Sequence, residues 1–205
     1  LTQVRCQEDW GGIVLKQYAE LMEHADGTVA DARCPEAVNL IERYNEERNL
    51  SIQVADIEPI LIHCARELSA RADLADGEKI ITTPCRILAE QGNALELPHT
   101  RFVSWKDFFS ELGESLEPAP EASPIPPGFF TGLSVPVVSL SGREDIEDYL
   151  EERSRTSEGE SEDRMMSGTA GSQNIGAVIA DAGRKPLLLE LLYCPKGCHM
   201  GDGVR

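Results

Sequence analysis

The run Leu187-Leu188-Leu189-Glu190-Leu191-Leu192-Tyr193-Cys194 is apolar except at Glu190, and it ends on a cysteine. A short continuous apolar run of this kind predicts a buried β-strand. The β-branched segment 79–83 and the segment 101–103 predict two further strands. Apolar residues recur at helical spacing in the stretches before and between these strands. These predicted helices cover 13–24, 35–49, 57–68, 105–112, 143–153 and 175–182. Strands that alternate with helices predict an α/β fold in which parallel strands are flanked by helices.

Capping residues refine two of these helices. Asp56 is predicted as the N-cap of the helix over 57–68, and Ser104 as the N-cap of the helix over 105–112. The buried side of the first of these helices is predicted to carry Ile57, Ile60, Leu61, Cys64 and Leu68.

The length of 205 residues predicts one domain over 1–205. Five prolines in 117–128 indicate a surface loop, and the acidic, Ser- and Gly-rich stretch 156–172 is predicted to be mobile. Nineteen Lys and Arg against 36 Asp and Glu give a formal charge of −17, which argues against nucleic-acid binding. The sequence has no apolar run of about 18 residues and opens without a signal-peptide pattern, so we expect no direct membrane insertion and a cytoplasmic location.

Six cysteines stand at 6, 34, 64, 85, 194 and 198. Cys34 precedes a predicted helix, Cys85 and Cys194 follow predicted strands, and Cys198 comes shortly after. Loops at the carboxyl ends of parallel strands converge at one edge of a sheet, and four thiolates gathered there suit either a tetrahedral zinc or an iron–sulfur cube. The three residues between Cys194 and Cys198 exceed the usual zinc-knuckle spacing of two, which favours a cluster.

The remaining candidates have simpler interpretations. Cys6 and Cys64 are predicted to be small buried hydrophobes. His199 is expected to be either an exposed loop histidine or a donor to a cluster sulfur.

Three segments together resemble the signature motifs of the iron-only ([FeFe]) hydrogenase catalytic domain, written TSCCPxW, MPCxxKxxE and ExMACPGGCxxGGG in that family. The corresponding segments here are Ala32-Arg33-Cys34-Pro35-Glu36, Thr83-Pro84-Cys85-Arg86-Ile87-Leu88-Ala89-Glu90 and Glu190-Leu191-Leu192-Tyr193-Cys194-Pro195-Lys196-Gly197-Cys198-His199-Met200-Gly201-Asp202-Gly203. Their order agrees, as do the prolines beside the first two cysteines and the CPxGC frame of the last motif. The likeness implies a hydrogenase-like domain with one [4Fe-4S] cluster bound by Cys34, Cys85, Cys194 and Cys198.

In that family the last cysteine also bridges to a two-iron subsite that turns over hydrogen, and the residues serving this subsite differ here. Arg33 stands at the position of the proton-donor cysteine, and an arginine does not relay its proton. Leu88 replaces the lysine that holds a cyanide ligand. Thr83, Leu192 and Ile60 replace two methionines and a glutamine. We therefore expect no diiron subsite, no catalytic residue and no hydrogen turnover.

The function that follows is electron transfer through the cluster, in a redox complex whose other subunits carry iron–sulfur clusters or flavin. Such a subunit would not be catalytic alone. The alternative is a redox-sensing regulatory domain that uses the same cluster. An active hydrogenase and a zinc-stapled structural protein are the remaining, less favoured, interpretations.

Overall fold

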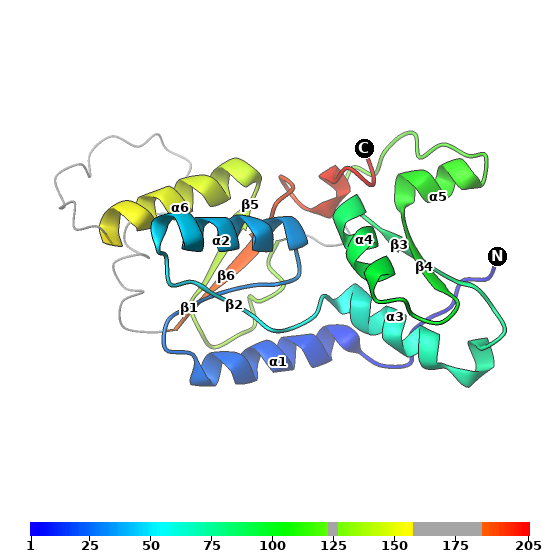
Figure 1. The fold of residues 1–205 in the computed structure, drawn as a ribbon, viewed down its shortest axis with the longest axis horizontal. Helices are drawn as coiled ribbons and strands as arrows, with labels where there is room; N and C mark the ends of the chain where they lie inside the picture. Colours follow the sequence, from blue (N-terminus) through cyan, green and yellow to red (C-terminus); the bar gives the residue numbers. More distant parts are fainter. Residues whose placement is uncertain (123–126, 158–185) are drawn as a thin grey trace.

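The computed structural model describes residues 1–122, 127–157 and 186–205 (Figure 1). Its helices are α1 Trp10–His24, α2 Pro35–Arg48, α3 Ile60–Ala70, α4 Arg86–Ala94, α5 Trp105–Glu111 and α6 Arg143–Ser157. Its strands are β1 Thr28–Ala30, β2 Gln53–Val54, β3 Lys79–Thr83, β4 Thr100–Ser104, β5 Val137–Ser141 and β6 Leu187–Leu192, and the short 3₁₀ turns are η1 Ala72–Leu74 and η2 Cys198–Met200. The predicted α/β alternation is confirmed.

The larger sheet has four parallel strands in the order β2-β1-β6-β5. All six residues of β6 are buried, because this strand lies between two others and both sheet faces are covered. That environment explains the unbroken apolar run. It also places Glu190 in the interior, where the carboxylate needs partners.

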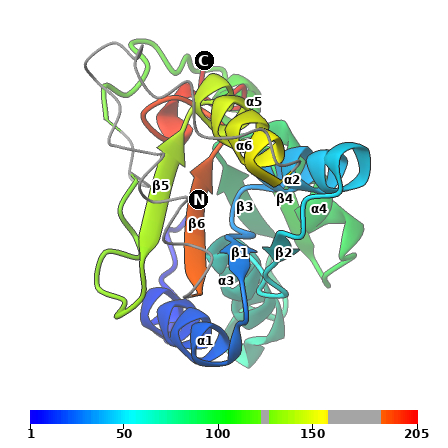
Figure 2. The same ribbon diagram turned by 90° about the vertical axis from the view of Figure 1, so that its left-hand side faces the viewer.

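Helices cover both faces of this sheet, as Figure 2 shows. On one face α1 packs through Val14, Tyr18 and Met22 against Val29 and Leu188. On the other face α2 and α6 share a second apolar cluster with residues that include Ala30, Leu140, Leu187, Leu189 and Leu191. Parallel strands with helices on both faces form the doubly wound arrangement, in which ligands lie beyond the carboxyl ends of the strands.

A separate two-stranded parallel sheet pairs β3 with β4. It has its own apolar cluster, in which α3 supplies Ile62 and Ala65 and α4 supplies Leu88 and Ala89. The strands predicted over 79–83 and 101–103 are therefore present, but they do not join the larger sheet. The convergence of the cysteine loops must then depend on contacts between the two sheets.

Ser104 caps α5 as predicted, since its Oγ accepts a hydrogen bond from the Asp107 amide at 3.1 Å. The prediction of Asp56 as a cap is wrong. Helix α3 begins at Ile60, with extended Pro59 at its N-cap. The proline ring disfavours helical backbone at the residue before it, which accounts for a helix that begins only after Pro59.

The buried side of α3 also differs from the prediction. Ile62 and Ala65 are its buried residues, whereas Leu61, Cys64 and Leu68 are only half-buried. The predicted helix over 175–182 and most of the stretch 156–172 lie outside the described residues, as do residues 123–126 of the proline-rich loop.

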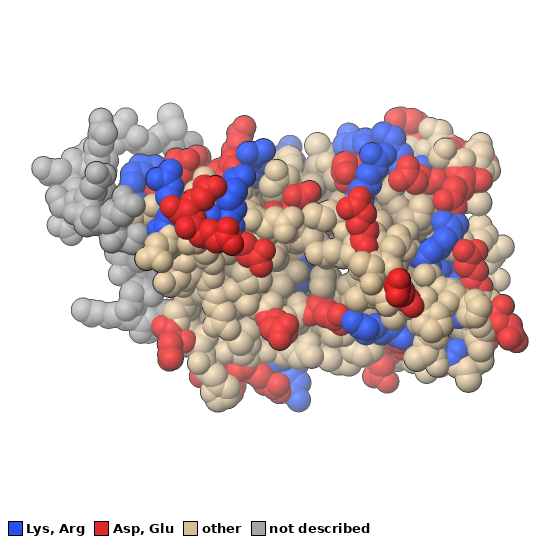
Figure 3. Space-filling model, in the orientation of Figure 1, with Lys and Arg blue, Asp and Glu red and all other residues tan. Residues whose placement is uncertain are grey.

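Figure 3 shows acidic side chains gathered over the outer surfaces of α2 and α6. The exposed acids of these two helices include Glu42, Glu46, Glu47, Glu144, Asp148 and Glu151. Among the described residues, no helix has the length and apolar character that crossing a membrane requires.

Candidate functional site

Three cysteines follow the carboxyl ends of strands. Cys34 comes after β1 and Cys194 after β6, and these strands are neighbours in the four-stranded sheet. From this pair the sheet extends to β2 on one side and to β5 on the other, so the order of the chain reverses here. Such a reversal opens a crevice between the loops. Cys85 follows β3, which belongs to the other sheet.

The C-terminal turn joins the two sheets at this point. After Cys198, which opens η2, the chain folds over the Pro84–Cys85 loop, where the Gly203 amide donates to the Pro84 carbonyl at 3.2 Å. A Cβ on Gly201 would lie 2.5 Å from the Pro84 carbonyl oxygen, and a Cβ on Gly203 would lie 2.8 Å from it. Backbone packs on backbone here, which explains why glycine occupies both positions.

Asp202 adds a second link between the turn and α4. Its Oδ1 accepts a hydrogen bond from the Arg86 amide at 3.1 Å, at the first residue of the helix. A carboxylate at this place satisfies an otherwise free N–H and interacts favourably with the helix dipole. The turn that carries Cys198 is thus fixed against the loop that carries Cys85.

The four cysteines predicted as ligands influence one another electrostatically. Burial is the first cause that raises the pKa of Cys85 to about 12, of Cys194 to about 11 and of Cys198 to about 12. Charge on Cys34 raises the pKa further at all three, and Cys198 also responds to Cys85 and Cys194. The thiols of Cys85, Cys194 and Cys198 therefore each lie within electrostatic range of Cys34, and the four cysteines come from three separate segments of the chain.

Backbone N–H groups face two of these thiols. Burial raises the pKa of Cys34, and hydrogen bonds from the Tyr193, Ala37 and Glu36 amides act in the opposite direction. At Cys85 the Leu88 amide has the same effect. Both cysteines are N-caps, Cys34 of α2 and Cys85 of α4, so their sulfurs lie at the positive ends of helix dipoles. These donors would stabilise thiolate once a metal replaced the protons.

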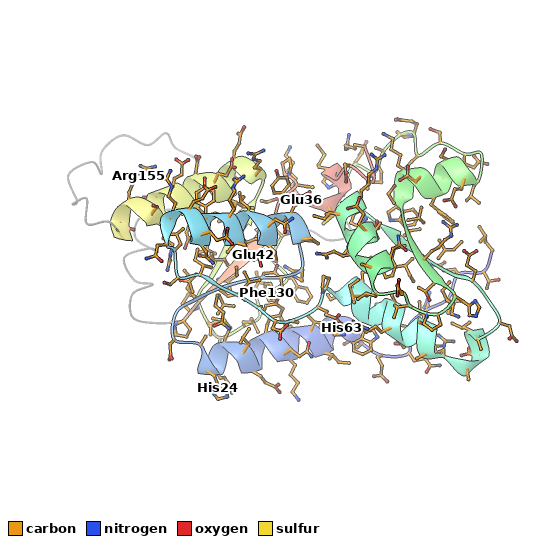
Figure 4. All side chains as sticks on the ribbon, in the orientation of Figure 1. His24, Glu36, Glu42, His63, Phe130 and Arg155 are labelled. Atoms are coloured by element: carbon orange, nitrogen blue, oxygen red, sulfur yellow. The ribbon has the colours of Figure 1, made fainter. Side chains whose placement is uncertain are left out.

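A buried ion network lies beside the cysteines. Arg33 binds Asp31 through Nε at 2.9 Å and Nη2 at 2.8 Å, and its Nη2 also donates to Glu190 at 3.0 Å. Its guanidinium stacks 4.4 Å from the ring centroid of Phe129 and 4.5 Å from that of Phe130. Figure 4 shows Phe130 in the interior, close to the four-stranded sheet.

The remaining oxygens of this network are also satisfied. Glu190 accepts hydrogen bonds from the Gly128 amide at 2.7 Å, the Phe129 amide at 2.8 Å and the Ser139 hydroxyl. Burial opposes the charge on Arg33, but Asp31 and Glu190 more than offset it and raise its pKa. Arg33 therefore stays charged, and its charge offsets a small part of the rise that burial and the neighbouring cysteines cause in the pKa of Cys198.

A hollow of about 760 Å³ opens beside this site. Its lining includes Cys85 and Cys194 together with the acidic residues Glu36, Asp202 and Glu144. In Figure 4 Glu36 projects near the start of α2, next to the C-terminal turn. The charged groups of this lining are mainly acidic, and Glu36 and Asp202 both raise the pKa of Cys194.

The described side chains do not form a ready-made site for a single metal ion. Within the described part of the chain, no group of three or more His, Cys, Asp and Glu side chains is arranged to hold a metal ion.

Three sequence interpretations change here. His199 is buried, which excludes the exposed loop histidine, and its Nδ1 has no hydrogen-bond partner among the described residues. Cys6 and Cys64 are half-buried rather than fully buried, and their side chains contact each other.

The ion network around Arg33 was not predicted. Its one sequence signal was Glu190, a charged residue inside an apolar strand.

Comparisons with known proteins find no relative: no family model matches the chain, and neither a curated protein nor a solved structure matches it significantly. The resemblance to iron-only hydrogenases thus stays a prediction from the motifs.

Proposed function

We propose that this chain binds one [4Fe-4S] cluster through Cys34, Cys85, Cys194 and Cys198 and transfers electrons within a redox complex. When bound, the cluster supplies reversible one-electron chemistry. Partner subunits carrying iron–sulfur clusters or flavin would supply and remove the electron, in the cytoplasm. The observation that supports the proposal is the approach of three segments: Cys85 and Cys194 line one hollow, the turn after Cys198 packs on Pro84, and Cys34 affects the pKa of all three of these cysteines.

The surroundings of the thiols support a negatively charged cofactor. Amide groups of α2 face Cys34, an amide of α4 faces Cys85, and the cationic Arg33 acts on Cys198. Each of these stabilises negative charge that four thiolates would bring into a half-buried site. Because burial raises the thiol pKa values, the protons must leave as iron binds.

Arg33 is also the reason to propose a cluster without a diiron subsite. By motif position it replaces a proton donor, and here both its Asp31 and Glu190 contacts are buried ion pairs. A guanidinium held on two sides and stacked on two phenyl rings has neither a labile proton nor freedom to move. General acid–base chemistry needs a titrating group within reach, so hydrogen turnover is not part of the proposal.

The hollow beside Cys85 and Cys194 supports electron transfer to a partner. It provides a side of the site at which another redox protein could approach. Its acidic lining favours a partner with a complementary basic surface.

The test is anaerobic reconstitution of the full chain with iron and sulfide. We expect about four irons and four sulfides per chain, a broad visible absorbance and, after reduction, the electron paramagnetic resonance signal of one reduced cube. Cys85→Ala should lose most of the bound iron. Cys64→Ala is the matched control, because it removes a cysteine outside the site and should leave the iron content unchanged.

Other outcomes would replace the proposal. Stoichiometric zinc with no visible absorbance would indicate a structural zinc site. Infrared bands of carbon monoxide or cyanide ligands would indicate a diiron subsite and overturn the argument from Arg33. A reconstituted cluster that fails to reduce or oxidise a redox partner, yet changes the chain's binding to a regulatory one, would favour redox sensing.

A further inference from the structure

The N-terminal segment lies along α3 and runs against the direction of the helix. The Arg5 carbonyl accepts from Arg71 Nη1 at 2.8 Å, and the Gln7 amide donates to Glu67 Oε1 at 2.7 Å. The Trp10 indole donates to Glu67 Oε2 at 2.7 Å. The segment is thus attached at both ends and in the middle to the last turns of α3.

Trp10 extends this attachment towards the start of the helix. Its ring stacks on His63 with the centroids 5.0 Å apart and the planes 9° from parallel. Figure 4 shows His63 on α3 close to α1. Since Trp10 is the first residue of α1, the contact joins the helix of one sheet to the helix of the other.

Two cysteines meet inside this attachment. Cys6 lies between Arg5 and Gln7, both of which are hydrogen-bonded to α3. Cys64 lies three residues before Glu67 and therefore on the same face of the helix. The two side chains are close enough to hydrogen-bond, and both are half-buried, so small molecules in solution can reach them.

We propose that Cys6 and Cys64 form a reversible redox-active pair whose disulfide locks the N-terminal segment, and with it α1, against α3. The pair lies outside the four-cysteine site, so this proposal is independent of cluster binding. It assigns a role to the two cysteines that the sequence alone predicts to be small buried hydrophobes.

The oxidant is a small disulfide such as oxidised glutathione. The Cys6 thiolate attacks one glutathione sulfur, the glutathione S–S bond breaks, and one glutathione thiolate leaves. Cys64 then loses its proton and attacks the Cys6 sulfur, which forms the protein S–S bond and releases the second glutathione. Two electrons and two protons pass from the protein dithiol to oxidised glutathione, which becomes two reduced molecules.

The order of attack follows from the surroundings of Cys64. Burial, and then contact with Cys6, raises the pKa of Cys64 to about 12, so its thiolate is scarce at neutral pH. Cys6 is therefore the first nucleophile and Cys64 the resolving thiol.

The disulfide closes a loop that contains α1, β1, α2 and β2. Helix α1 packs on the four-stranded sheet, whereas α3 packs on the two-stranded sheet. Oxidation would therefore restrict movement of one sheet relative to the other. A closed loop of this length stabilises a protein mainly by restricting its unfolded chain.

The test treats the full-length reduced chain with mixtures of reduced and oxidised glutathione, blocks free thiols and maps the peptides after tryptic cleavage. We expect a linked pair of peptides, 6–16 and 49–66, that accumulates with the oxidised fraction and disappears with dithiothreitol. Its formation should raise the melting temperature by about 5–15 °C.

Cys6→Ser is the matched variant, because it removes one sulfur at a half-buried position. It should lose both the linked peptides and the thermal shift, while its reduced form melts near the reduced parent. The proposal fails if both thiols stay free in oxidised glutathione alone. It also fails if Cys6 or Cys64 links mainly to one of the other four cysteines, or if the linked chain melts no higher than the reduced one.

Discussion

Replacing Arg33 with methionine tests the buried ion network most directly. Methionine keeps an unbranched apolar side chain beside the phenyl rings, but it is shorter than arginine and removes the charge, the hydrogen bonds and the stacking of the guanidinium. The side chains of Asp31 and Glu190 are 0% and 1% exposed, so both carboxylates would lose their cation in the interior. Breaking a buried pair by removing one partner costs about 3–5 kcal/mol, because an uncompensated charge stays behind.

That loss is a large part of a stability of about 5–15 kcal/mol. For a chain of this size, 1 kcal/mol corresponds to about 2–4 °C in melting temperature, so Arg33→Met should melt about 6–20 °C lower. Urea unfolding followed by circular dichroism measures the free energy directly. Arg43→Met is the control, because Arg43 and Glu147 form a pair with side chains 48% and 23% exposed. It should change the free energy of unfolding by less than about 1 kcal/mol.

A double-mutant cycle separates the ion pair from lost packing. Glu190→Gln removes one of the two uncompensated charges and keeps a side chain that can still accept from the Gly128 or Phe129 amide. Arg33→Met with Glu190→Gln should therefore cost less than the sum of the single changes. If Arg33→Met costs no more than Arg43→Met, or if the effects of Arg33→Met and Glu190→Gln simply add, the buried ion network does not stabilise the fold.

Three further predictions concern the attachments around the site. Burial raises the pKa of Glu67, but hydrogen bonds from the Gln7 and Glu8 amides and from Trp10 lower it overall. Their stabilisation is complete above about pH 4.5 and is lost as the pH falls through the lowered value. Tryptophan fluorescence should report this acid transition, and Glu67→Gln should abolish it. Gly203→Ala should push the C-terminal turn away from Pro84 and weaken iron retention at least severalfold. Gly27→Ala is the control and should retain iron normally, because no described atom lies within 4 Å of the added Cβ. Equal iron retention in the two variants would show that close packing at Gly203 does not hold the site together. Because burial raises the pKa of the site thiols, cluster assembly should become faster and more complete from pH 7 to pH 9, and a rate independent of pH would contradict the need for proton release.

The local pattern predicted most elements because each depends on near neighbours in the chain. The apolar run over Leu187–Leu192 is a central strand, and Ser104 caps α5. The start of α3 was mispredicted because the constraint imposed by Pro59 on the residue before it outweighs the capping preference of Asp56. The contact between Cys6 and Cys64 could not be predicted, since hydrogen bonds across 57 or more residues create it.

The sequence by itself determined the alternation of helices and strands, and the placing of Cys34, Cys85 and Cys194 at the ends of those elements. Only the tertiary structure decided that β3 and β4 form a separate sheet, that the turn after Cys198 joins it to the other, and that Arg33 lies between two buried carboxylates. The physical reason is range. Periodicity and capping act over a few residues, whereas backbone packing at Gly203 and the pairing of Arg33 with Glu190 bring together groups more than 100 residues apart.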